Sequence, residues 1–155
     1  MEHIVVDNLL FLADTYANMV GGCTKVSVGS AIVKDGRIVS FGANRCIPNL
    51  CKVRGCLRVE KYGNNDKEHR NPGDCRAIHS EIDAICRAQC NIMGSEIYIT
   101  RYPCESCARA IVAAGIKTVW YGRGQKISEE TARIFESGDV NVYWVKGWDA
   151  PDATN

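Results

Sequence analysis

Residues 79–107 read HSEIDAICRAQCNIMGSEIYITRYPCESC and hold the sequence that decides the fold. After His79, apolar residues recur at helical spacing, which predicts a helix from residue 79 to about residue 89. Residues 96–100 are rich in β-branched and aromatic side chains and predict a strand. Pro103 is favourable at the start of a helix over residues 104–114, and Gly115 is a typical helix end. This stretch therefore predicts a helix, a strand and a second helix.

The sequence on either side extends this unit into a sheet. An amphipathic helix is predicted over residues 3–18, and Asp35-Gly36 between two β-rich runs is a strong hairpin signal. The remaining predicted elements are strands at residues 26–34, 37–41, 117–121 and 140–145 and a helix at residues 129–136. Later strands that alternate with helices run parallel, whereas the hairpin is antiparallel. We therefore expect one α/β domain over residues 1–155, a three-layer α/β/α sandwich around a five-stranded mixed sheet.

Residues 45–76 show no sustained periodicity. They contain Pro, Gly, Asn, charged residues and four cysteines, which are Cys46, Cys51, Cys56 and Cys75. A structureless loop of this length is uncommon inside a domain. The segment therefore predicts an organising feature other than an apolar core, such as a bound metal ion.

The composition limits the class of protein and of ligand. The chain has 155 residues, with 19 basic and 18 acidic side chains and a formal net charge of +1. A charge this small does not favour duplex nucleic acid and suits a small metabolite. The first residues lack a cationic region followed by an apolar run, and no run is long enough to span a membrane. The expectation is a cytoplasmic protein whose nine cysteines serve as metal ligands and buried thiols.

One histidine and two cysteines in the opening stretch form a candidate zinc site. A catalytic zinc ion takes three protein ligands and leaves a fourth position for water, and His79, Cys104 and Cys107 can supply the three. Residues two apart on a helix point about 200° from each other, so His79 and Glu81 share a site only if His79 lies at the helix entrance. Glu81 would then be the carboxylate that moves protons. The alternative is a purely structural zinc site, which has no need of Glu81.

These residues carry a resemblance to a known family. His79-Ser80-Glu81 followed by Pro103-Cys104-x-x-Cys107 resembles the cytidine and deoxycytidylate deaminase superfamily. Within it the chain is most similar to deoxycytidylate (dCMP) deaminases of bacterial or phage type. The resemblance implies a cytidine deaminase-like fold, a catalytic zinc ion, Glu81 as the catalytic residue and hydrolysis of dCMP to dUMP and ammonia. It also implies a homo-oligomer, either a dimer or a hexamer.

The same resemblance implies further site residues. Asn44 would bind the sugar hydroxyl, the backbone amide of Ser80 would bind the pyrimidine carbonyl, and Tyr102 would line the pocket beside the base. Three cysteines are similar to the extra cysteines that a bacterial type has before the His-x-Glu helix, and they could hold a second, structural zinc ion. They are Cys51, Cys56 and Cys75, with Cys46, His69 or neither as the fourth ligand. The alternative is three ordinary thiols.

The chain departs from this family at two positions. Asp83 stands where the family usually has Asn two residues after the catalytic Glu, and Arg45 stands where Gly usually follows the sugar-binding Asn. Arg45 is therefore a candidate for binding a phosphate or another anion. The departures make the substrate less certain than the type of reaction, and two further functions stay open. One is deamination of another amino-nucleobase as a base, nucleoside or RNA residue, and the other is a non-catalytic, zinc-stabilised interaction module.

Overall fold

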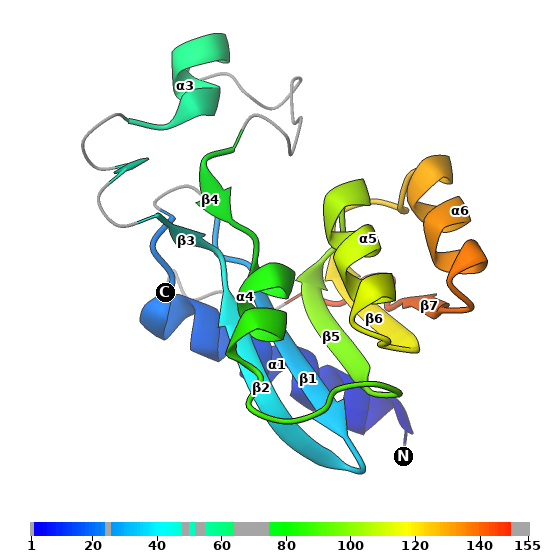
Figure 1. The fold of residues 1–155 in the computed structure, drawn as a ribbon. Helices are drawn as coiled ribbons and strands as arrows, with labels where there is room; N and C mark the ends of the chain where they lie inside the picture. Colours follow the sequence, from blue (N-terminus) through cyan, green and yellow to red (C-terminus); the bar gives the residue numbers. More distant parts are fainter. Residues whose placement is uncertain (1, 24–25, 48–49, 52–54, 64–74, 150–155) are drawn as a thin grey trace.

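The computed structural model describes residues 2–23, 26–47, 50–51, 55–63 and 75–149. Five strands form its main sheet in the spatial order β2-β1-β5-β6-β7 (Figure 1). Their bounds are Gly29–Lys34 (β1), Arg37–Ala43 (β2), Glu96–Arg101 (β5), Thr118–Arg123 (β6) and Asn141–Trp144 (β7). Strand β1 is antiparallel to β2 and to β5, whereas β5, β6 and β7 are parallel. The predicted five-stranded mixed sheet is confirmed.

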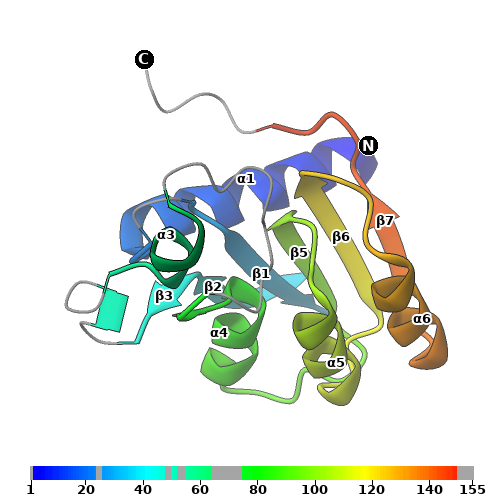
Figure 2. The same ribbon diagram turned by 90° about the horizontal axis from the view of Figure 1, so that it is seen from above.

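Helices cover both faces of the sheet (Figure 2). Helix α1 (Glu2–Val20) lies on one face, and α4 (Ser80–Arg87), α5 (Glu105–Ala113) and α6 (Glu129–Ser137) lie on the other. This arrangement confirms the predicted three-layer α/β/α sandwich. None of the helices in the described part of the chain is both long and apolar enough to cross a membrane.

The central strand β5 is buried on both sides, as expected for a strand between two helical layers. Ile97 and Ile99 are fully buried in the core shared with α4, α5 and α6. Tyr98 points to the opposite core beneath α1. Full burial of one such isoleucine contributes about 2 kcal/mol to folding. This packing fixes the carboxyl end of β5, where the Pro103-Cys104 segment leaves the sheet.

Helix α4 is packed very close to strand β2. A methyl group added at Gly42 would overlap the Ser80 carbonyl oxygen and the Ala84 backbone nitrogen. The Ser40 hydroxyl also donates a hydrogen bond of 2.6 Å to the Ala84 carbonyl. Because only glycine allows this approach, Gly42 brings the first turn of α4 against the end of β2.

The segment predicted to lack regular structure contains two short elements, and a third directly follows it. They are β3 (Arg45–Cys46), α3 (Leu57–Tyr62) and β4 (Ala77–Ile78), of which β3 and β4 pair to form a small second sheet. The expectation of no secondary structure over residues 45–76 is therefore wrong for β3 and α3. Elements this short have too little periodicity to be recognised in a sequence.

Candidate active site

The three predicted metal ligands come together where two helices begin. His79 is the N-cap of α4, Cys104 is the N-cap of α5, and Cys107 lies in the first turn of α5. His79 has an extended backbone conformation (φ −70°, ψ 151°), so the helix starts only at Ser80. Glu81 is thus just inside the helix, as the shared site requires.

The geometry of these three side chains fits a zinc ion. His79 Nδ1 lies 3.5 Å from Cys104 Sγ and 3.3 Å from Cys107 Sγ, and the three donor atoms are all within 4.8 Å of one another. Zinc–nitrogen bonds of about 2.1 Å and zinc–sulfur bonds of about 2.3 Å place N and S about 3.6 Å apart in a tetrahedron. The observed separations match that edge, so these residues can hold zinc with little rearrangement.

Without a metal ion, two of the three ligands hold protons that zinc would displace. A contact with Cys107 and another with His79 lower the pKa of Cys104 to about 4, which makes it a thiolate at neutral pH. Contact with Cys104 raises the pKa of His79 to about 10, and Cys104 and burial raise the pKa of Cys107. The site therefore carries one thiolate beside two groups that hold protons. Binding of a divalent metal ion releases such protons.

Glu81 is buried beside this cluster and is only 4% exposed. Burial raises the pKa of its carboxyl group, while the nearby His79 opposes that rise. The Ser80 hydroxyl donates a hydrogen bond of 3.3 Å to Glu81 Oε2 and is itself hydrogen bonded to Ser30 on β1 at 2.7 Å. A carboxyl group with a raised pKa and a fixed orientation is suited to proton transfer near neutral pH.

One pocket joins this cluster to the residues expected to bind substrate. Asn44, Ser80, Glu81 and Tyr102 all line it. The Asn44 side chain accepts a hydrogen bond of 3.0 Å from the Val28 N–H and donates one of 2.6 Å to the Val26 carbonyl. A carboxamide has two acceptor positions and two donor hydrogens, so one of each stays available for a ligand.

Two arginines in this pocket were not singled out from the sequence. Arg58 in α3 and Arg101 at the end of β5 both line it. Arg101 follows Ile97 and Ile99 at alternate positions of β5, so it belongs to the face on which α4 and α5 pack. That alternation, directly before Tyr102, was a signal that the sequence offered.

The two departures from the family pattern contact each other. Arg45 Nε donates a hydrogen bond of 2.9 Å to Asp83 Oδ2, and Arg45 Nη2 donates one of 2.9 Å to the Tyr16 hydroxyl. Asp83 also accepts hydrogen bonds from the Ala43 N–H at 3.0 Å and from Arg87 Nε at 2.8 Å. The guanidinium of Arg45 is therefore engaged within the protein, which disfavours the anion-binding role considered for it. The ion pair joins α4 to the chain beside Asn44.

We expect this ion pair to make stability depend on pH. Burial raises the pKa of Asp83, but the Ala43 N–H and the two guanidinium groups outweigh it and hold the pKa below 3.8. A carboxyl group with a lower pKa in the folded state stabilises the fold above its unfolded pKa, and this stabilisation is lost as the pH falls through the folded pKa. Asp83→Asn should therefore lower the free energy of unfolding by about 2 kcal/mol at pH 7 and by much less at pH 3.

Urea unfolding of both proteins between pH 3 and pH 7 measures this difference. Loss of a bound metal ion at low pH affects both proteins and cancels in the comparison. Asp149→Asn is a matched control, because Asp149 is 79% exposed and its ion pair with Arg123 contributes little. The two proteins could instead differ in free energy of unfolding by the same amount at every pH. That result would show that the ionised Asp83 carboxylate does not stabilise the fold.

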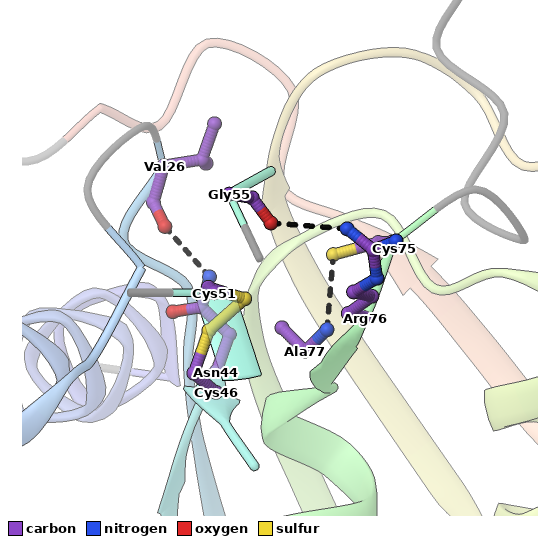
Figure 3. Close-up of a disulfide and its surroundings, with 8 residues drawn as sticks. All are labelled: Val26, Asn44, Cys46, Cys51, Gly55, Cys75, Arg76 and Ala77. Atoms are coloured by element: carbon purple, nitrogen blue, oxygen red, sulfur yellow. Dashed lines mark hydrogen bonds between the residues drawn. A yellow bond between two sulfur atoms is a disulfide. The ribbon is translucent and has the colours of Figure 1, made fainter. Parts of the chain in front are cut away.

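The structure separates the cysteines of the predicted second metal site. Cys51 forms a disulfide with Cys46, with a Cα–Cα distance of 5.9 Å (Figure 3). A disulfide sulfur is not a thiolate, so Cys51 and Cys46 cannot serve as metal ligands while they are paired. Cys56 and Cys75 are free and line the same pocket as His79. His69 lies outside the described residues. Within the described part of the chain, the group able to hold a metal is His79, Cys104 and Cys107.

Comparison with known proteins places this site in a family. Residues 6–123 match the model described as the cytidine and deoxycytidylate deaminase zinc-binding region. The chain belongs to this family. The matched span includes Glu81 and all three metal-binding side chains. Membership in this deaminase family confirms the resemblance based on the two motifs and supports zinc as the metal.

Individual members of the deaminase family show how far the likeness extends. The chain is similar to "ComE operon protein 2" of Bacillus subtilis (strain 168), with 35% identity over 131 residues, 80% of the chain and 62% of that protein. It is 29% identical over 140 residues to the deoxycytidylate deaminase of Saccharomyces cerevisiae, covering 88% of the chain and 43% of that protein. The chain thus spans less than two-thirds of the length of these relatives.

A solved structure supports the fold. The dCMP deaminase of the cyanophage S-TIM5, in complex with dCMP and dUMP, superimposes with a TM-score of 0.69 and 23% identity. The match covers 94% of this chain and 99% of that one. At this level of identity the likeness shows the fold alone, which confirms the expected cytidine deaminase-like architecture.

Proposed function

We propose that this protein is a zinc-dependent hydrolase that deaminates a cytosine nucleotide, converting dCMP to dUMP with release of ammonia. One observation carries this proposal. A buried Glu81 lies beside the metal-binding group His79, Cys104 and Cys107, in a pocket that the substrate-binding candidates also line. A structural zinc site would need neither a buried carboxylate nor an adjoining pocket.

Each residue has a distinct part in the proposed reaction. His79, Cys104 and Cys107 hold the zinc ion, which when bound supplies Lewis acidity that makes water nucleophilic near neutral pH. Glu81 accepts a proton from the attacking water and passes it to a ring nitrogen of the base. It then accepts the remaining proton from the newly added hydroxyl group and delivers it to the amino group, which leaves as ammonia while the carbonyl of uracil forms.

The pocket walls would orient the nucleotide. The N–H groups at the start of a helix have no partner within the helix, so the Ser80 amide is available to the pyrimidine carbonyl. The free donor and acceptor positions of Asn44 suit a sugar hydroxyl. Tyr102 would lie beside the base, and a methyl group at Gly124 would overlap its ring, so Gly124 helps to fix where that ring lies. These three roles are proposals that rest on the family resemblance and on the shared pocket.

We expect dCMP to be the preferred substrate. Ammonia release should be measured for cytosine, adenine and guanine bases, nucleosides and monophosphates, with kcat/KM for each. The value for dCMP should exceed that for deoxycytidine by roughly 100-fold, because a site built for a polar group discriminates strongly against a ligand that lacks it. Preference for an adenine or guanine compound would instead support the deaminase of another nucleobase. No turnover of any compound would support the non-catalytic module.

We also retain the second metal ion as a proposal. Cys56 and Cys75 are free thiols on the wall of one pocket, and a contact with His79 lowers the pKa of Cys75. Cys51 could join them only with its disulfide reduced. A reducing compartment favours that state, and two zinc ions per chain in reduced protein would support the site.

We further propose that the protein acts in the cytoplasm as a homo-oligomer, a dimer or a hexamer. The thiolate ligands of the site favour a reducing compartment. Helix α1 exposes large apolar side chains at Ile4, Phe11 and Met19, which is typical of a surface that contacts another subunit. The mass of the protein in solution tests the assembly.

A further inference from the structure

The pocket contains two positive charges that the zinc site does not explain. Arg58 and Arg101 line it together with Asn44 and Glu81. Cations on the wall of a pocket attract an anionic ligand.

Arg101 is placed to meet a ligand. It is partly exposed at the end of β5, and its guanidinium carbon lies 5.2 Å from the centre of the Tyr102 ring. Arg45, by comparison, is already paired with Asp83. Arg101 takes part in none of the ion pairs found among the described residues. Its charge is therefore available to the pocket.

Arg58, the second arginine of the pocket, has a buried nitrogen without a partner in the part of the chain that the structure describes. It lies in the first turn of α3, and its Nε is buried without a hydrogen-bond partner among the described residues. A buried donor left without a partner is costly, and native structures rarely contain one. A bound anion would supply the missing acceptor.

We propose that Arg101 and Arg58 bind the phosphate of a nucleoside monophosphate and so make the enzyme select nucleotides over nucleosides. This inference rests on the proposed function and names the residues that would set its substrate class. A guanidinium binds phosphate through two parallel hydrogen bonds, which gives arginine an advantage over lysine at such sites. The phosphate belongs to a mononucleotide rather than to a polymer, because a net charge of +1 provides no extended basic surface for a nucleic acid.

Equilibrium binding of the product tests the inference without turnover. Titration calorimetry of zinc-loaded protein with dUMP and with deoxyuridine compares ligands that differ only in the phosphate. Arg101→Ala and Arg58→Ala should each weaken dUMP binding by about 10-fold and change deoxyuridine binding by less than about 2-fold. Arg101→Lys should keep part of the affinity for dUMP. Arg133→Ala, on α6 and outside the pocket, is the matched control.

Three other outcomes would contradict the proposed phosphate site, and each can be distinguished from the others. Equal losses for dUMP and deoxyuridine would mean that the arginines contact the base or the sugar, or only support the pocket. Unchanged dUMP binding in both alanine variants would place the phosphate elsewhere. Wild-type protein that binds neither ligand and releases no ammonia from dCMP would contradict the proposed function itself, and the phosphate site would fall with it.

Discussion

Replacing Glu81 with glutamine should lower kcat for dCMP by about 10³-fold or more, because a positioned general acid and base contributes roughly 10² to 10⁴. Glutamine keeps the shape and the hydrogen-bond acceptor of this buried side chain but cannot accept and return a proton. The Ser80 hydroxyl, which donates to Glu81 Oε2, can donate to the glutamine oxygen instead. Zinc content, the circular dichroism spectrum and the affinity for dUMP should therefore stay close to those of wild type. Steady-state ammonia release measures the loss.

The control for this variant is a carboxylate at the start of the neighbouring helix. Glu105→Gln removes an exposed charge from the first turn of α5, between the two cysteine ligands. It should leave kcat within about 3-fold of the wild-type value. Glu105 is exposed and does not line the pocket that contains Glu81, so it cannot exchange protons with a bound substrate. If Glu81→Gln kept wild-type turnover, or if both variants lost turnover equally, the role of Glu81 as proton shuttle would be wrong.

The meeting of the two zinc-site motifs could be predicted because it depends on preferences of residues that are close in the sequence. The Pro103-Cys104 segment follows helix-start preferences that act within one turn, and the Asp35-Gly36 turn has positive φ at both residues (51° and 75°), as its sequence indicates. The order of strands and helices then limits the topology to a few arrangements. Two short motifs separated by a helix and a strand therefore meet at the carboxyl end of the central strand β5.

Features that depend on distant contacts could not be predicted in this way. Arg45 and Asp83 are 38 residues apart, and nothing in either neighbourhood shows that they pair. Because Arg45 and Asp83 pair with each other, the two departures from the family pattern are one structural change. It consists of a buried carboxylate and its guanidinium partner. Helix α3 was missed because its six residues carry too little periodicity, and its Glu60 pairs with Arg76, 16 residues away in the chain.

Removing a zinc ligand should abolish activity and remove the stabilisation that zinc provides. A ligand present at 1,000 times its dissociation constant stabilises the folded state by about 4 kcal/mol. Wild-type protein should therefore lose about this much free energy of unfolding when a chelator is added. Cys107→Ala should show no such difference and should contain one zinc ion fewer per chain. Cys107 is 1% exposed, so this variant also loses some packing. The difference between zinc-loaded and chelated protein excludes that packing loss, because both states of the variant lack the thiol.

A second cysteine variant distinguishes the loss of a metal ligand from the loss of any thiol. Cys90 is exposed and is not one of the three metal-binding side chains, so Cys90→Ala should keep both its zinc and the effect of the chelator. Cys75→Ser distinguishes one metal site from two, because it should lower the zinc content by one ion only if a second site uses this thiol. Chelator sensitivity that survives in Cys107→Ala would mean that the stabilising metal is bound elsewhere. In that event the group formed by His79, Cys104 and Cys107 would not be the zinc site, and Glu81 would have no metal-activated water to deprotonate.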